Sequence, residues 1–185
     1  MESVLTQITM FADQAHGTQM RKYSPDRYIV HPVRVMAIVR QYDQRLPLLA
    51  AALLHDVIED TPVSPGQMRE FLLTVMDPKH AQQTLGLVIE LTDVFTKADY
   101  PQFNRRVRKD KELARVLTTS PDAQTVKYAD ILDNSREIAA SDPNFAPRYL
   151  RECLAILERA DKGHRQLRET ALHTVRVALA VVGKG

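Results

Sequence analysis

Apolar residues recur every three to four positions along most of this chain, which is the spacing of helices that bury one face. No run of Val, Ile, Thr or aromatic residues alternates with polar ones as a half-buried strand does. The pattern therefore predicts an all-α fold. We expect helices at 3–16, from His31-Pro32 onward, within 46–62, and at 65–75, 79–93, 103–118, 121–140, 146–160 and 164–182.

Three Ser-Pro or Asp-Pro pairs stand where helices should begin: Ser64-Pro65, Asp77-Pro78 and Ser120-Pro121. The first residue of each pair can cap free backbone amides, and proline tolerates the missing donor of the first turn. These pairs divide the chain into short antiparallel helices.

The 185 residues are long enough for one well-buried core, and no repeat, low-complexity tract or linker divides them. We expect a single domain over 1–185, a helical bundle with a motif-bearing core at about 8–140 and supporting helices at 145–182.

The charge and cysteine content of the chain limit the classes of partner that we expect for it. The formal net charge of +2 is too small to indicate a nucleic-acid or membrane-surface partner, although a local basic patch would suffice for a phosphorylated small molecule. The one cysteine, Cys153, excludes an internal disulfide and lies among apolar neighbours, as a packed core thiol would. No stretch approaches the roughly 20 apolar residues of a membrane span, so we expect a cytoplasmic protein. The oligomeric state, a homo-oligomer included, stays open.

The apolar stretch 46–62 ends in four side chains that suit acid/base or metal chemistry. On a continuous helix His55 stacks on Glu59 and Asp56 on Asp60, so the four share an arc of roughly 140°. The two aspartates repel each other and the helix supplies no Lys or Arg, so a bound cation would compensate them. The alternative is a solvated helix end, which rarely follows so apolar a run.

Further candidates stand elsewhere in the chain. His31 follows the apolar lead-in Tyr28-Ile29-Val30, which could bury it, and His16 is a candidate cleft residue. Asp130 shares a helix face with Asn134, four residues on. His31 could instead be a cap or a core residue, and Asp130 an exposed residue of an amphipathic helix. Spacing leaves both alternatives open.

Three motifs together strongly resemble the hydrolase domain of the RelA/SpoT alarmone enzymes, which belong to the HD-domain superfamily of metal phosphohydrolases. The motifs are Tyr28-Ile29-Val30-His31-Pro32, then Ala51-Ala52-Leu53-Leu54-His55-Asp56-Val57-Ile58-Glu59-Asp60-Thr61, then Lys127-Tyr128-Ala129-Asp130-Ile131-Leu132-Asp133-Asn134. With no synthetase domain on the chain, it is similar to the stand-alone small alarmone hydrolases of the metazoan Mesh1 type.

The resemblance implies a Mn²⁺-dependent 3′-pyrophosphohydrolase that converts (p)ppGpp, a small-molecule nucleotide, into GDP or GTP and pyrophosphate. It implies one divalent ion, usually Mn²⁺ rather than Fe²⁺ or Zn²⁺, and an acidic pair that works on the attacking water. It assigns the ion to His31, His55, Asp56 and Asp130, the water to Glu59 and Asp60, the nucleotide base to Arg21 and Lys22, and the ribose and phosphates to Asn134.

Departures from the family concern the substrate. Tyr128 replaces the usual Leu, and Asp133 stands where an aromatic residue or His is common, which adds negative charge beside the expected nucleotide pocket. The basic segment 104–109 only loosely resembles the family's substrate-facing region, and some of its cations could meet a distal phosphate.

Two alternatives therefore remain open. One is hydrolysis of (p)ppApp or another nucleotide such as NADPH at the same metal site. The other is a non-catalytic nucleotide-sensing HD module, whose usual signature is loss of a ligand or of the acidic pair. This chain keeps all of them.

Overall fold

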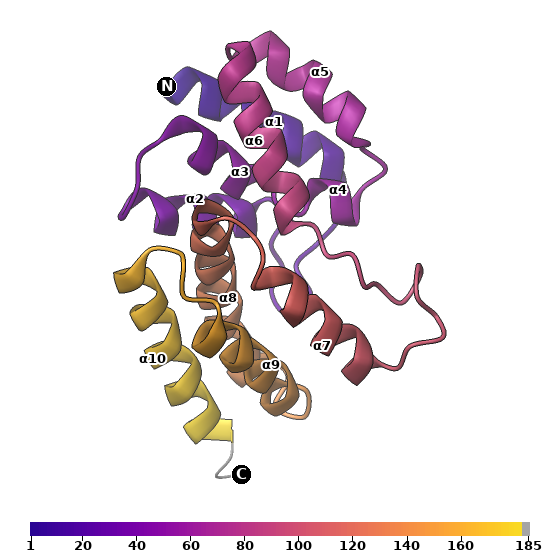
Figure 1. Ribbon diagram of the computed structural model, residues 1–185, viewed down its shortest axis with the longest axis vertical. Helices are drawn as coiled ribbons and strands as arrows, with labels where there is room; N and C mark the ends of the chain where they lie inside the picture. Colours follow the sequence, from indigo (N-terminus) through magenta and orange to yellow (C-terminus); the bar gives the residue numbers. More distant parts are fainter. Residues whose placement is uncertain (183–185) are drawn as a thin grey trace. The chain divides into compact units, whose positions relative to one another are not determined.

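The structure, a computed structural model, describes residues 1–182, and all of its regular elements are helices (Figure 1). Within this range it contains no strand, only an isolated β-bridge between Met20 and Arg27. The all-α prediction is confirmed. The helices are α1 (Glu2–His16), α2 (Val30–Arg40), α3 (Leu46–Leu54), α4 (Val57–Asp60), α5 (Pro65–Val75), α6 (Pro78–Leu91), α7 (Arg105–Val116), α8 (Pro121–Ser141), α9 (Ala146–Arg159) and α10 (Arg165–Val182).

The three predicted caps are confirmed. The Ser64 side chain accepts from the backbone amide of Gln67. The backbone amide of Ser64 in turn donates to the side-chain oxygen of Gln67, which completes a capping box. Asp77 accepts from the first-turn amides of α6, and Ser120 accepts from the amide of Ala123 at the start of α8. Local chemistry alone therefore fixes where these helices begin.

The central helix is not continuous, contrary to the prediction. It breaks after Leu54, and His55 and Asp56 form a turn before the short helix α4. Helix α3 is buried on every side from Leu48 to Leu54. It has no solvent face of its own because α1, α2 and α6 all pack against it.

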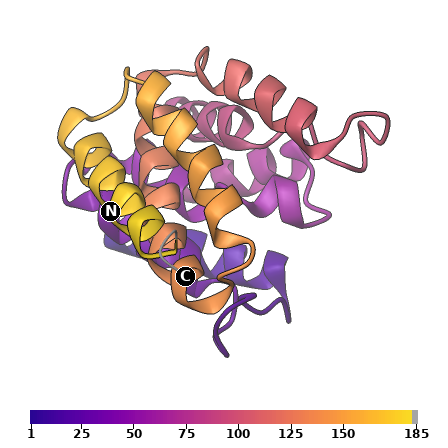
Figure 2. The ribbon, with the colours of Figure 1, turned by 90° about the horizontal axis from the view of Figure 1, so that it is seen from below.

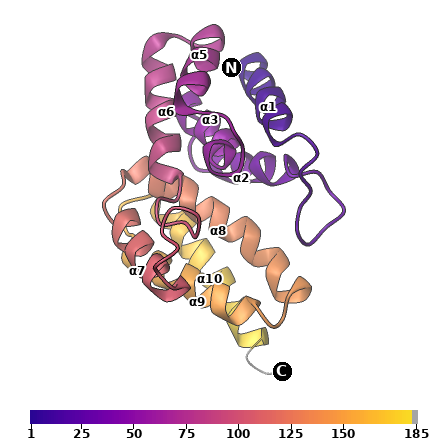
Figure 3. The same cartoon turned by 90° about the vertical axis from the view of Figure 1, so that its right-hand side faces the viewer.

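The chain forms two compact units, residues 1–92 and the residues from 93 onward. The first contains α1 to α6. There α5 packs beside α6 (Figure 3), and the rings of Phe11 and Phe71 stack 3.9 Å apart. The second contains α7 to α10, where α10 packs along both α8 and α9 (Figure 2).

Tyr128 ties α8 to the turn that joins α9 and α10. Its hydroxyl donates to the carbonyl of Ala160 at 2.7 Å and accepts from the amide of Gly163 at 3.2 Å. The ring is fully buried. The departure at position 128 is thus a structural feature of the second unit.

No helix within residues 1–182 combines the length and apolar character needed to cross a bilayer.

We predict that Gly163→Ala destabilises the protein by about 1–3 kcal/mol, because a Cβ there would lie 2.5 Å from Cε2 of Tyr128 and 2.8 Å from the amide nitrogen of Thr125. Urea unfolding measures the change in the free energy of unfolding. The matched control is Gly86→Ala in α6, where a Cβ would meet nothing within 4 Å. The control should stabilise by about 0.5–1 kcal/mol, since alanine favours a helix interior. Equal stability of the two variants would contradict the close packing around Gly163.

Cys153 is a buried free thiol, as predicted from its neighbours. Burial raises the pKa of this thiol to about 12. At pH 8 the folded protein should therefore react with a thiol reagent far more slowly than the protein unfolded in urea, because the thiolate is the nucleophile. Absorbance after addition of Ellman's reagent measures the rate. Rapid stoichiometric labelling of the folded protein would show that the thiol opens to solvent.

Candidate metal centre

Two imidazoles and a carboxylate converge in the first unit. His31 on α2 and His55 and Asp56 at the break after α3 each offer one ligand atom, and these atoms all lie within 4.8 Å of one another. Nε2 of His55 is 3.0 Å, and Nε2 of His31 3.7 Å, from the same carboxylate oxygen of Asp56. Both imidazoles are buried. The structure thus brings together three of the four predicted metal ligands.

The orientation of His55 is fixed by its other nitrogen. Nδ1 lies 2.9 Å from the carbonyl oxygen of Ala52, in the last turn of α3. Because a carbonyl only accepts, Nδ1 carries a proton. In the neutral ring, the form that a metal ligand requires, Nε2 then keeps its lone pair on the side of Asp56. Metal-ligating histidines are typically held in this way.

Tyr28 completes the group around Asp56. Its hydroxyl donates to the Asp56 carboxylate at 2.6 Å, and its ring meets the His31 ring edge-on, with centroids 6.0 Å apart. From the sequence, Tyr28 is expected only as part of an apolar lead-in to His31. Its place three residues before His31 is the one signal that could have indicated a role in the site.

The donor set fits a divalent cation. With both imidazoles neutral, the three groups carry one negative charge in a largely buried position, where an uncompensated charge is costly. Imidazole and carboxylate ligands without a thiolate suit Mn²⁺, Fe²⁺ and Zn²⁺. The trio could therefore hold such an ion.

The acidic pair lies next to this group, but not as predicted. Glu59 and Asp60 are exposed on α4, and Asp60 accepts a 3.2 Å hydrogen bond from the side chain of Gln19. The single 140° arc was wrong because it required an unbroken helix. The break after Leu54 separates the buried His55 and the half-buried Asp56 from the two exposed acids that follow.

Asp130 belongs to the second unit, where it is buried on α8. It accepts from Lys127 at 3.1 Å and from Asn134 at 2.6 Å. The predicted pairing of Asp130 with Asn134 on one helix face is confirmed, and the alternative of an exposed Asp130 is excluded. Asp133 is also buried, so its charge does not lie in open solvent.

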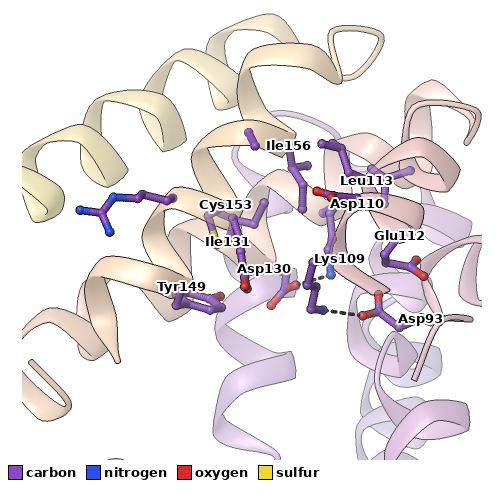
Figure 4. A pocket seen from close by; sticks show the side chains of 15 residues that line it. Asp93, Lys109, Asp110, Glu112, Leu113, Asp130, Ile131, Tyr149, Cys153 and Ile156 are labelled. Carbon is purple, nitrogen blue, oxygen red and sulfur yellow. Dashed lines mark hydrogen bonds and ion pairs between the residues drawn. The ribbon is translucent and has the colours of Figure 1, made fainter. Parts of the chain in front are cut away.

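A cavity of about 280 Å³ opens beside Asp130 among α7, α8 and α9 (Figure 4). Its walls include apolar side chains such as Ile131 and Ile156. Across it Lys109 donates to Asp93 at 3.0 Å. Burial alone would raise the pKa of Asp93, but the charges of Lys127 and Lys109 outweigh it, so the pKa lies below its usual value. The cavity therefore presents ionised groups beside an apolar wall.

The basic segment 104–109 contributes to a groove of about 680 Å³ in the same unit. Arg105 forms a bidentate ion pair with Glu152 at 2.9 and 2.7 Å. Arg148 and Arg151 from α9 also line the groove, which spacing along the sequence did not indicate. These cations form one basic surface of the second unit.

Arg21 and Lys22, the pair predicted to bind the nucleotide base, lie against two different aromatic rings. The Arg21 guanidinium lies over the Tyr28 ring, 5.8 Å from its centroid, whereas Lys22 lies over Tyr23 and donates to its hydroxyl at 2.7 Å. Arg21 is thus placed beside a side chain that contacts Asp56.

The chain is similar in sequence to proteins of a known family. The sequence matches the HD domain family over residues 9–159. It is 34% identical over 151 residues to a guanosine-3′,5′-bis(diphosphate) 3′-pyrophosphohydrolase of Haemophilus influenzae, covering 80% of this chain and 20% of that protein. It is 33% identical over 183 residues to the protein of that name from Vibrio cholerae, covering 97% and 23%. The chain thus spans about a fifth of the length of these relatives.

Among solved structures, one is described as a metazoan ortholog of SpoT that hydrolyses ppGpp and plays a role in starvation responses. It shares the fold with a TM-score of 0.69 at 22% identity, over 98% of this chain and 94% of that one. A Listeria monocytogenes protein matches with a TM-score of 0.61 at 19% identity, over 81% and 99%. The family match covers most of the sequence and includes the converging trio His31, His55 and Asp56, so the chain belongs to the HD domain family.

Proposed function

We propose that this chain is a metal-dependent hydrolase that removes pyrophosphate from the 3′ position of (p)ppGpp. The observation that carries the proposal is the convergence of two buried imidazoles, His31 and His55, with the carboxylate of Asp56, and the two exposed acids on the next short helix. The names of the Haemophilus and Vibrio relatives support the reaction and the substrate class.

The proposal treats the chain as one HD domain. The family match runs from residue 9 to residue 159 and crosses the boundary between the two compact units near residue 92. The matched range includes Asp130, which we propose as the fourth ligand.

We propose Mn²⁺ as the ion, with Fe²⁺ and Zn²⁺ as the alternatives that the same donors allow. When bound, a divalent ion supplies a Lewis acid for a phosphoryl oxygen and lowers the pKa of a coordinated water. The protein's own contribution is to hold the Nδ1 proton of His55 on the carbonyl of Ala52, which leaves Nε2 as the ligand atom, and to hold the Asp56 carboxylate with the hydroxyl of Tyr28.

The carboxylates of Glu59 and Asp60 work on the attacking water: they orient it, and one or the other accepts its proton as general base. The water oxygen bonds to the phosphorus attached to the 3′ oxygen, the bond from that phosphorus to the ribose breaks, and the 3′ oxygen takes a proton. The products are pyrophosphate and a nucleoside with its 5′ phosphates. In this scheme Arg21 and Lys22 flank the base, and Asn134 lies near the ribose and phosphates.

We predict that Mn²⁺ binds to the chelator-treated protein and raises its melting temperature, because an ion that binds only the folded state stabilises it. Asp56→Ala should weaken Mn²⁺ binding by about 100-fold or more, since second-shell changes alone reach that size. Calorimetric titration measures the affinity without any substrate. The matched control is Glu70→Ala, an exposed acid on α5, which should bind like the wild type. Undiminished binding by the Asp56 variant would place the ion elsewhere.

We predict that the purified protein releases pyrophosphate from ppGpp, that chelation stops the release and that Mn²⁺ restores it. Asp56→Ala should abolish turnover while circular dichroism still shows a helical fold. Product analysis on ppGpp, ppApp and NADPH identifies the substrate. Release of pyrophosphate from ppApp alone, or of inorganic phosphate from NADPH alone, would replace the guanine alarmone as substrate. Tight nucleotide binding without hydrolysis would favour the sensing module.

A further inference from the structure

A hydrogen-bond chain runs from the end of α1 to the acidic pair. Nδ1 of His16 lies 2.9 Å from Oε1 of Gln19, and Nε2 of Gln19 donates to a carboxylate oxygen of Asp60 at 3.2 Å. His16 is buried, whereas Gln19 and Asp60 are more accessible. The chain therefore connects a protected imidazole to an exposed carboxylate.

The direction of each hydrogen bond follows from the chemistry of its ends. A carboxylate only accepts, so Gln19 must turn its NH₂ group to Asp60 and its oxygen to His16. That oxygen also only accepts, so Nδ1 of His16 must carry the proton. In the neutral ring Nε2 of His16 is then the bare nitrogen, and it is buried with no hydrogen-bond partner among residues 1–182. The network thus selects one tautomer of His16, the opposite of the one that histidine favours in water.

Backbone hydrogen bonds hold the residues of this hydrogen-bond chain, His16 and Gln19, in place. α1 ends at His16, and Gly17 follows with φ +56°, a conformation that glycine adopts without strain. The amide of Gln19 donates to the carbonyl of His16 at 3.0 Å, and the amide of Tyr28 donates to the carbonyl of Gln19 at 2.9 Å. Both ends of the loop that carries Arg21 are therefore fixed next to Gln19.

His16 is linked to two carboxylates of the site, those of Asp56 and Asp60. The His16 ring packs against the Tyr28 ring, with centroids 4.5 Å apart, and Tyr28 donates to Asp56. One packed pair of rings therefore stands behind a donor to Asp56 and a donor to Asp60. This arrangement indicates that His16 does more than fill space in the core: it is linked to the donors of two carboxylates in the site.

We propose that His16 and Gln19 are positioning residues that hold the Asp60 carboxylate in one orientation for its work on the attacking water. The inference rests on the proposed function, in which Asp60 belongs to the acidic pair. An exposed aspartate on a helix of four residues is otherwise free to rotate, and a fixed donor removes that freedom before the substrate arrives. The expected loss lies in kcat rather than in substrate or metal binding.

The first test needs no substrate. Long-range ¹H–¹⁵N spectra of the ¹⁵N-histidine-labelled protein report which ring nitrogen carries the proton. We expect His16 in the Nδ1–H tautomer in the wild type, and a loss of that state in Gln19→Leu. An Nε2–H tautomer in the wild type would overturn the hydrogen-bond chain.

The second test measures kcat, KM and Mn²⁺ affinity with ppGpp for four variants. Gln19→Leu and His16→Leu should lower kcat by about 10-fold, the effect of one hydrogen bond to a charged group, and leave KM and Mn²⁺ affinity within about 2-fold of wild type. His16→Asn should recover most of kcat, because its amide nitrogen can donate from the position of Nδ1. Gln82→Leu makes the same change at an exposed site on α6 and should match the wild type.

The outcomes separate the two proposals. Hydrolysis by the wild type with unchanged kcat in Gln19→Leu would refute the positioning role while leaving the function intact. A parallel fall in kcat, Mn²⁺ affinity and melting temperature, without rescue by His16→Asn, would assign His16 to the fold instead. A wild type that hydrolyses none of the nucleotides would refute the proposed function and with it a role of the chain in turnover, whereas the tautomer would still decide whether the chain forms.

Discussion

The Asp56 carboxylate, held by the hydroxyl of Tyr28 and faced by the buried imidazoles of His31 and His55, is the interaction on which the site depends. Removing a charged group from water is costly unless other groups compensate it. One donor at 2.6 Å provides part of that compensation, and a divalent cation would provide the rest. Any change that separates these groups leaves a buried charge with less support, so the position of α2 relative to α3 is constrained by chemistry as well as by packing.

The break after Leu54 makes this arrangement possible. Helix α3 is buried on all sides and so is held rigidly by α1, α2 and α6. Its last turn offers the carbonyl of Ala52, which fixes the proton of His55. The turn then lets Asp56 follow while the exposed acids continue on a separate short helix. A rigid apolar helix that ends in a turn can therefore present a buried imidazole, a half-buried carboxylate and two accessible acids within six residues.

In the second unit, the buried carboxylate of Asp130 is also stabilised by hydrogen-bond donors. Lys127 and Asn134, one turn to either side of Asp130 on α8, both donate to it, so a single helix supplies the charge and the hydrogen bond that a buried carboxylate needs. The rest of α8 is held by Tyr128, whose hydroxyl reaches the turn before α10, and by the absence of a side chain at Gly163. Packing on one face of α8 thus fixes the acid on the other.

The sequence by itself determined the helical class, most helix limits and the identity of the chemical groups, because periodicity, proline and capping side chains act over a few residues. It could not determine where the central helix breaks, since Asp56 is held by the hydroxyl of Tyr28, a contact between distant parts of the sequence that no local pattern records. Nor could it reveal the link from His16 through Gln19 to Asp60, which spans 41 residues between its last two members. Only the tertiary structure decided these points, because the direction of a hydrogen bond depends on which groups the fold brings within reach.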